Sequence, residues 1–200
     1  MIVVGLLFAA AFADQGAAAP RQVGAVIEPS DVVEQYRLHA AERGLQGRDR
    51  ELLCRPGAEG LQVCATVLGA GVWRYATYAD EDVKAPTASV EGKTQGFEKK
   101  TVKGVGEYWV RAENDGREGL FYVQPGLLEA VSTVPLVVAW PQPGVVLAWV
   151  PGNPSLDQIL SVGVAKMAAE TSHPISSMVY RQVDGEWTVW GEAKAGEDGP

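Results

Sequence analysis

The 200-residue sequence has little of what catalytic and metal sites are usually built from, since it contains only two histidines and two cysteines. The motifs G-x-S-x-G, S-x-x-K and H-E-x-x-H are missing from it. A zinc site needs four suitably spaced ligands, and no cluster of Cys and His supplies them. The sequence therefore predicts no catalytic residue, no metal ligand and no cofactor.

The two histidines are interpreted as structural residues. His39 falls near the C-terminal turn of a predicted helix, where the helix dipole favours a positive charge. His173 precedes Pro174 at the exit of a second predicted helix, where its side chain can cap free carbonyl groups. A Ser–His pair that uses His173 is the catalytic alternative.

Positive charge is also scarce, because 17 Lys and Arg face 25 Asp and Glu and give a formal net charge of −8. Nucleic acid repels a protein of this charge, so we expect no nucleic-acid partner. The acidic run Asp80–Asp82 lacks the alternating spacing of a calcium loop and is interpreted as a solvated loop. No apolar run reaches the roughly 20 residues that span a bilayer. We therefore expect no membrane span in the mature chain.

The chain begins with an apolar run, MIVVGLLFAAAF, which ends in the small residues of the tripeptide AFA. A short apolar run followed by small residues is typical of a secretory signal peptide. We predict that residues 1–13 are removed after Ala13 and that the protein is exported, to the periplasm or the medium. The alternative is a buried strand or helix at the start of a cytosolic domain.

The two cysteines, Cys54 and Cys64, lie in two strand-like segments on either side of the turn residues GAEG. In a hairpin centred near Glu59 they are directly opposite each other, with Cα atoms about 4.5 Å apart. This separation is at the short end of the range that a disulfide accepts. Their spacing does not fit a C-x-x-C redox pair. Because exported thiols normally oxidise, we predict a structural Cys54–Cys64 disulfide.

Strand-like segments interrupted by a few helical ones predict an α+β fold with mainly antiparallel sheets and about three helices. The expected helices cover residues 30–44, 125–132 and 153–172. A tight turn at Asn114–Gly116 is expected to join two strands. The C-terminal part predicts a hairpin, a helix and a second hairpin, and the helix is capped by Asn153 with Pro154 in its first turn.

Composition predicts the domain boundaries. Residues 14–28 are rich in Ala, Gly and polar residues and are interpreted as a flexible lead-in. Residues 29–191 are expected to form a single α+β domain, and two packed halves with a boundary near residue 117 are the alternative. The polar residues 192–200 are predicted to be a disordered tail.

Trp140 and Trp149 frame the turn Pro141–Gly144 of the first C-terminal hairpin. Because both faces of this hairpin are apolar, its strands are expected to be central in their sheet. A four-residue turn would place both tryptophans on its large-residue face and the helix 153–172 on the opposite, small-residue face. The large face then either packs in the core or forms a binding surface that contains Trp140 and Trp149.

The C-terminal third resembles the YtpQ-like family of bacterial proteins of unknown function. The resemblance lies in the order LFYVQPGLLEAV, PLVVAWPQPGVVLAWVPGN, LDQILSVGVAKM and HPISSMVYRQVDGEW, from Leu120 to Trp190. In that family the hairpin turn often reads P-N-R-D, whereas this chain has Pro141-Gln142-Pro143-Gly144. The Arg and Asp of the family are therefore absent here, and the resemblance implies a chain order but no site residue.

Three functions remain open. The missing catalytic motifs and the six tryptophans favour a non-catalytic module that binds an unknown protein or peptide partner. The second function is a hydrolase-type enzyme that uses carboxylates from separate strands, and the third is a structural domain that accompanies a functional partner. A pocket with two or more carboxylates of perturbed pKa would favour the enzyme. A flat apolar patch near Trp140 would favour the binding module.

Overall fold

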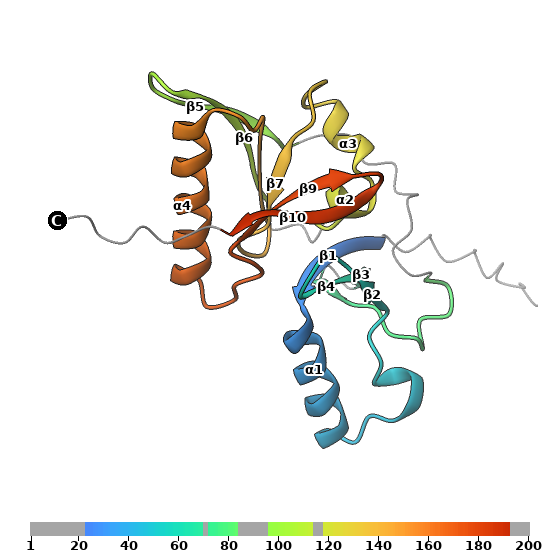
Figure 1. Ribbon diagram of the computed structural model, residues 1–200. Helices are drawn as coiled ribbons and strands as arrows, with labels where there is room; N and C mark the ends of the chain where they lie inside the picture. Colours follow the sequence, from blue (N-terminus) through green and yellow to red (C-terminus); the bar gives the residue numbers. More distant parts are fainter. Residues whose placement is uncertain (1–22, 70–71, 84–95, 114–117, 193–200) are drawn as a thin grey trace, which may run out of the picture.

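The computed structural model describes residues 23–69, 72–83, 96–113 and 118–192. Its strands form two antiparallel sheets, and the predicted α+β class is confirmed (Figure 1). The predicted signal peptide, residues 1–13, lies outside the described residues. Residues 193–200 of the predicted tail also lie outside them. No described helix is both long enough and apolar enough to cross a membrane.

The larger sheet has six strands in the order β10-β9-β7-β8-β6-β5. They are β5 (Glu98–Val102), β6 (Gly106–Ala112), β7 (Val137–Ala139), β8 (Val145–Trp149), β9 (Met178–Val183) and β10 (Glu186–Glu192). Strands β7 and β8 are buried throughout and lie in the middle of the sheet, as predicted. The edge strand β5 carries the exposed side chains of Lys99 and Lys100, and charges on an edge discourage pairing with another sheet.

Helix α4 (Pro154–Glu170) covers one face of the larger sheet (Figure 1). The side chain of Asn153 accepts hydrogen bonds from the backbone N–H groups of Ser155 and Leu156, at 3.2 and 3.3 Å. Because Pro154 lacks an N–H and follows this cap, the helix begins as the sequence predicts. The predicted hairpin–helix–hairpin order is confirmed, since α4 connects the β7–β8 hairpin to the β9–β10 hairpin.

The predicted register of the β7–β8 hairpin is wrong by one residue. Ala139 pairs with Leu147 and Val137 with Trp149, which places Trp149 on the face that α4 covers. The physical reason is the turn, in which the N–H of Val145 donates to Gln142 O at 3.2 Å around Gly144, whose φ is +75°. A one-residue change in a hairpin connection exchanges the two faces of a strand.

The smaller sheet is built on β3 (Leu61–Gly69), which pairs with β1 (Val23–Pro29) on one side. On its other side β3 pairs with β2 (Cys54–Pro56) and β4 (Val72–Tyr75). Strand β1 lies within the predicted flexible lead-in, and its residues 24–27 are buried, so that prediction is wrong for residues 23–28. The small side chains that indicated flexibility instead let β1 pack closely, because Ala25 and Ile27 face a core shared with the larger sheet.

The described residues form four helices, and one of them, α2, replaces a predicted strand. Besides α4 they are α1 (Ser30–Glu42), α2 (Leu120–Val123) and α3 (Gly126–Glu129), and Gly47–Asp49 forms a short 3-10 turn. The segment 120–123 was expected to be a strand after a turn at 114–116, which lies outside the described residues. It forms one helical turn instead, and the N–H of Gly119 donates to Ala25 O at 2.9 Å, so the turn docks on β1.

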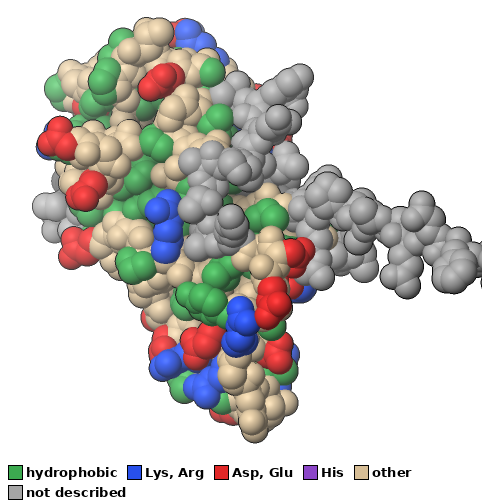
Figure 2. Space-filling view, turned by 90° about the vertical axis from the view of Figure 1, so that its right-hand side faces the viewer, with side chains coloured by type: hydrophobic (Ala, Val, Ile, Leu, Met, Phe, Trp, Pro, Cys, Tyr) green, Lys and Arg blue, Asp and Glu red, His purple; other side chains and the backbone are tan. Residues whose placement is uncertain are grey.

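The second face of the larger sheet packs against β1, β3, α2 and α3. Trp140 lies at the centre of this core, with its ring against those of Tyr122, Tyr180 and Trp187. Helix α1 extends away from this core, and only Ala40 of its side chains is buried (Figure 1). Charged side chains of both signs gather at that end of the molecule (Figure 2). The shared core therefore joins the two sheets, whereas α1 is peripheral.

Candidate ligand-binding cleft

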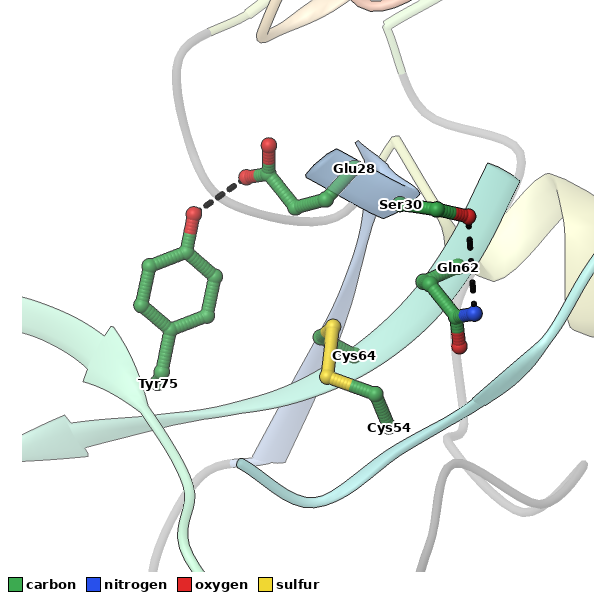
Figure 3. The surroundings of a disulfide bond; sticks show 6 residues. All are labelled: Glu28, Ser30, Cys54, Gln62, Cys64 and Tyr75. Atoms are coloured by element: carbon green, nitrogen blue, oxygen red, sulfur yellow. Dashed lines mark hydrogen bonds between the residues drawn. A yellow bond between two sulfur atoms is a disulfide. The ribbon is translucent and has the colours of Figure 1, made fainter. Parts of the chain in front are cut away.

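The predicted disulfide is confirmed. Cys54 on β2 and Cys64 on β3 are paired in register and bonded, with Cα atoms 4.0 Å apart (Figure 3). The bond fixes the short strand β2 to the centre of the smaller sheet. It lies beside Glu28 and Tyr75, which belong to the cleft described below.

The predicted binding surface at Trp140 and Trp149 is wrong, because both side chains are completely buried. Trp140 donates its Nε1–H to the backbone carbonyl of Glu118 at 3.3 Å. Trp149 donates to Asp157 Oδ1 at 2.9 Å. Both faces of the hairpin are covered, one by α4 and the other by the smaller sheet with α2 and α3. Neither tryptophan can therefore meet a partner.

The structure places a cleft elsewhere, between the smaller sheet and the C-terminal end of α4. Its volume is about 1480 Å³. One wall is formed by residues of the smaller sheet and of the start of α1. The sheet supplies Val26, Glu28, Pro29, Leu61, Thr66, Arg74 and Tyr75, and α1 supplies Asp31, Val32 and Gln35. The opposite wall is formed by α4 and the segment after it, with Ala165, Ala168, Ala169, Ser172, His173, Pro174, Ser176 and Ser177. The cleft therefore brings together parts of the chain that are far apart in sequence.

Strand alternation explains which side chains of the smaller sheet line the cleft. Successive residues of a strand point to opposite faces, and paired residues share a face. Ala25 and Ile27 face the core, so Val26 and Glu28 face away from it. Thr66 pairs with Tyr75 in the β3–β4 register and lies on this same face.

Glu28 and Tyr75 form the polar centre of this face. The hydroxyl of Tyr75 donates to Glu28 Oε1 (Figure 3). Burial raises the pKa of Glu28, while the hydrogen bond from Tyr75 and the charge of His173 act in the opposite direction. The pKa of Tyr75 is raised well above its usual value by burial and by the negative charges of Glu28 and Glu118. Tyr75 therefore stays protonated at neutral pH and remains the donor.

Thr66 is the least satisfied polar side chain of the cleft. It is only 4% exposed. Its Oγ1 has no hydrogen-bond partner among the described residues. A buried hydroxyl without a partner costs about 1–3 kcal/mol relative to one that is hydrogen-bonded. Such groups are rare in native proteins, and each one calls for an explanation such as strain, a functional role or a bound partner.

Arg74 also lines the cleft, but its guanidinium already forms an ion pair with Asp80. The two guanidinium nitrogens of Arg74 donate to the two carboxylate oxygens of Asp80 at 2.9 and 2.5 Å. Asp80 also accepts from the backbone N–H of Thr77 at 2.9 Å. The interpretation of Asp80–Asp82 as a solvated loop is therefore wrong for Asp80, which is buried and anchors the segment after β4.

The wall opposite Glu28 is fixed by backbone hydrogen bonds. The N–H groups of Ile175 and Ser176 donate to the carbonyls of Pro141 and Trp140, at 3.0 and 3.1 Å. His173 is exposed at the rim, with Nδ1 at 2.8 Å from Ser172 Oγ. The Ser–His contact exists, but the two residues are adjacent in the chain and the histidine is exposed.

Sequence reasoning missed Glu28, Thr66, Tyr75 and Glu118 as cleft residues. One usable signal was Glu28 itself, a carboxylate at the end of the apolar run VGAVI. Thr66, inside the apolar strand LQVCATVL, was a weaker signal of the same kind. Which of these side chains meet depends on the pairing of β1, β3 and β4, and local patterns do not specify that pairing.

Within the described ranges, no group of three or more His, Cys, Asp or Glu could hold a metal ion. The polar side chains of the cleft are instead suited to hydrogen bonding with an organic ligand. Comparison with family models, curated proteins and solved structures finds no match. The resemblance of the C-terminal third to the YtpQ-like family stays a prediction.

Proposed function

We propose that this protein is an exported, non-catalytic module that binds an extended segment of another protein or a peptide in the cleft. The size of the cleft carries the proposal. Pockets for small molecules usually have volumes of about 300–1,000 Å³, whereas this cleft has about 1480 Å³. The Cys54–Cys64 bond supports export, because disulfides persist mainly outside the cytosol.

The lining of the cleft supports a peptide ligand. Part of its apolar lining comes from small side chains such as Val26, Ala165 and Ala168, which leave room for a main chain and its substituents. Ser177 lies on the opposite wall, where its hydroxyl is a potential partner for a peptide's N–H or C=O group. The hydroxyls of Ser172 and Ser176, on the same wall, already bond with His173 Nδ1 and Tyr180 Oη.

Binding of a synthetic peptide library tests the proposal. Ala169 is exposed on α4 and lines the cleft, so the Ala169→Trp variant should obstruct the cleft without disturbing the core. Lys166 is exposed on the same helix but does not line the cleft, which makes Lys166→Trp a matched control. We expect the wild type and Lys166→Trp to retain the same peptides and Ala169→Trp to lose them. Equal retention by all three proteins would place binding outside the cleft and contradict the proposal.

A hydrolase is the second candidate, because two carboxylates from separate segments line the same cleft. Glu28 belongs to β1, and Glu118 precedes α2. The charges of both carboxylates raise the pKa of Tyr75. A carboxyl group whose pKa is raised by burial can serve as a general acid. Incubation with peptide and oligosaccharide mixtures, followed by mass spectrometry, tests this candidate. Cleavage by the wild type that is lost in Glu28→Gln would favour the enzyme over the binding module.

A further inference from the structure

We infer that the cleft recognises a cationic side chain of its peptide ligand, the ammonium of a lysine or the guanidinium of an arginine. In this assignment the Glu28 carboxylate pairs with the charge and the Thr66 hydroxyl accepts a further hydrogen bond. The inference rests on the proposed function and names the chemistry of the ligand that this function leaves open.

The charge of the lining is the first argument. Four acidic residues line the cleft, namely Glu28, Asp31, Glu59 and Glu118. The basic lining residues are Arg74 and His173. Because both carboxylate oxygens of Asp80 already engage Arg74, that guanidinium does not neutralise the cleft. The cleft therefore attracts a cationic ligand and repels an anionic one.

Glu28 has a neutral hydrogen-bond partner, and this also favours a cationic ligand. Its carboxylate accepts a hydrogen bond from a neutral phenol, that of Tyr75. No Lys or Arg side chain forms a salt bridge with Glu28 in the described part of the chain. A partly buried carboxylate is stabilised by a cation that replaces its lost hydration. A ligand cation would supply that missing partner, and Figure 3 shows the Glu28 carboxyl turned toward Tyr75 across the sheet.

The buried hydroxyl of Thr66 supports the inference independently of charge. Thr66 lines the cleft, and its hydroxyl is buried and has no hydrogen-bond partner among the described residues. Thr66 is directly opposite Tyr75 in the β3–β4 register, so it lies beside the residue that contacts Glu28. Ammonium and guanidinium groups carry three and five N–H donors, so a cation paired with a carboxylate keeps donors for further acceptors.

The apolar lining distinguishes a basic side chain from a simple ion. Val26 lies on the cleft face of β1, and Ala165 and Ala168 lie on the wall opposite. The methylene stems of lysine and arginine pack well on such surfaces while their charged ends reach polar groups. A bare metal ion would need a cluster of ligands, and the described residues contain none.

Five-residue peptides test the inference, with the sequence Ala-Ala-X-Ala-Ala, an acetylated N-terminus and an amidated C-terminus. X is lysine, arginine, or one of their uncharged counterparts, norleucine and citrulline. Titration of the ¹⁵N-labelled protein at pH 7 gives the affinities. We expect the charged peptides to bind about tenfold more tightly than their counterparts, because charge-assisted hydrogen bonds are the stronger kind. The Glu28→Gln variant should lose this preference.

Two further variants separate recognition by the site from general electrostatics. Glu129 is exposed on α3 and does not line the cleft, so Glu129→Gln makes the same change in net charge and should keep the preference. Thr66→Val preserves the shape of the side chain but removes its hydroxyl, and should weaken binding of the charged peptides severalfold. The same ¹⁵N spectra report whether each variant is folded.

The failures of the two proposals are distinguishable. If norleucine and citrulline peptides bind in the cleft as tightly as the charged ones, the cationic preference is wrong and the peptide-binding function stands. If Glu129→Gln loses the preference as fully as Glu28→Gln, the assignment to Glu28 is wrong. If no peptide shifts a resonance of the cleft residues, both proposals are contradicted.

Discussion

Tyr75 donates its phenolic hydrogen to the carboxylate of Glu28 across the smaller sheet. The two residues come from β4 and β1, which pair with opposite sides of β3. Their contact therefore depends on the sheet as a whole and holds an acidic group in a partly buried position. The stability of the free protein should therefore depend on the ionisation of Glu28.

Replacing Glu28 by glutamine should stabilise the free protein at pH 7. Burial raises the pKa of Glu28 above its ordinary value of 4.5, so the folded state binds this proton more tightly than the unfolded state. Such a group makes the fold less stable as the pH rises from about 4.5 through the raised pKa. Glutamine avoids this loss and can still accept the hydrogen bond from Tyr75.

Urea unfolding at pH 7 and pH 4 checks this prediction. The gain in free energy of unfolding of Glu28→Gln should be present at pH 7 and nearly absent at pH 4, where the carboxyl group is largely protonated in both states of the wild type. His173 and Glu118 also face this site, so the control Glu129→Gln, on the exposed side of α3, accounts for the change in net charge. A Glu28→Gln variant that is less stable at pH 7 would mean that the carboxylate is already well paired.

Replacing both Cys54 and Cys64 by alanine should lower the free energy of unfolding by about 2–3 kcal/mol, because the closed loop is short. The sequence separation of the two cysteines is 10 residues. Chemical unfolding measures the loss, and the reduced wild type should lose a similar amount. Titration of the unfolded, unreduced protein should find no free thiol. Two reactive thiols would contradict the bond.

Truncating Trp149 to alanine should cost about 3–5 kcal/mol, as for other fully buried aromatic residues. Its indole is completely buried, and Asp157 accepts its hydrogen bond at 2.9 Å. Trp149→Phe keeps most of the packing but removes the hydrogen bond to Asp157. This missing hydrogen bond should lower the free energy of unfolding by about 1 kcal/mol, in addition to the loss caused by the smaller ring. Thermal or urea unfolding measures both variants. An alanine variant as stable as the wild type would mean that Trp149 is on the surface.

Gly119→Ala should destabilise the fold by about 1–3 kcal/mol, the usual cost of an overpacked core. A Cβ at Gly119 would lie 2.6 Å from the carbonyl oxygen of Ala25, where β1 and α2 meet. Gly126→Ala is the matched control, because a Cβ there meets nothing within 4 Å. Unfolding free energies of the two variants should differ clearly. Equal stability would show that α2 does not dock on β1 as described.

Local signals predicted several features correctly. The equal separations of Cys54 and Cys64 from Glu59 in the turn specify their pairing, and the Asn153-Pro154 pair specifies the start of α4. In each case a few neighbouring residues determine the geometry. The central position of β7 and β8 was predictable for a similar reason, because strands that are apolar on both faces must be covered on both.

The errors have physical causes that local patterns do not contain. The conformation at Gly144 shifts the β7–β8 register by one residue, and this shift moves Trp149 to the other face. Strand β1 is stable only because β3 pairs with it and α2 covers it, so its composition alone suggested flexibility. The cleft could not be predicted, because its lining comes from both ends of the described chain.

The most direct test of the account is to map where the lysine peptide, Ala-Ala-Lys-Ala-Ala, binds on the ¹⁵N-labelled protein. We predict saturable shifts of the backbone resonances of Glu28, Thr66, Tyr75 and Ser176, which line the cleft from both sides. Resonances of Lys100 on β5 and of Asp184 in the β9–β10 turn, which are outside the cleft, should not change. Shifts confined to the β5–β6 hairpin, or no saturable shift at any peptide concentration, would contradict the claim that this cleft is the binding site.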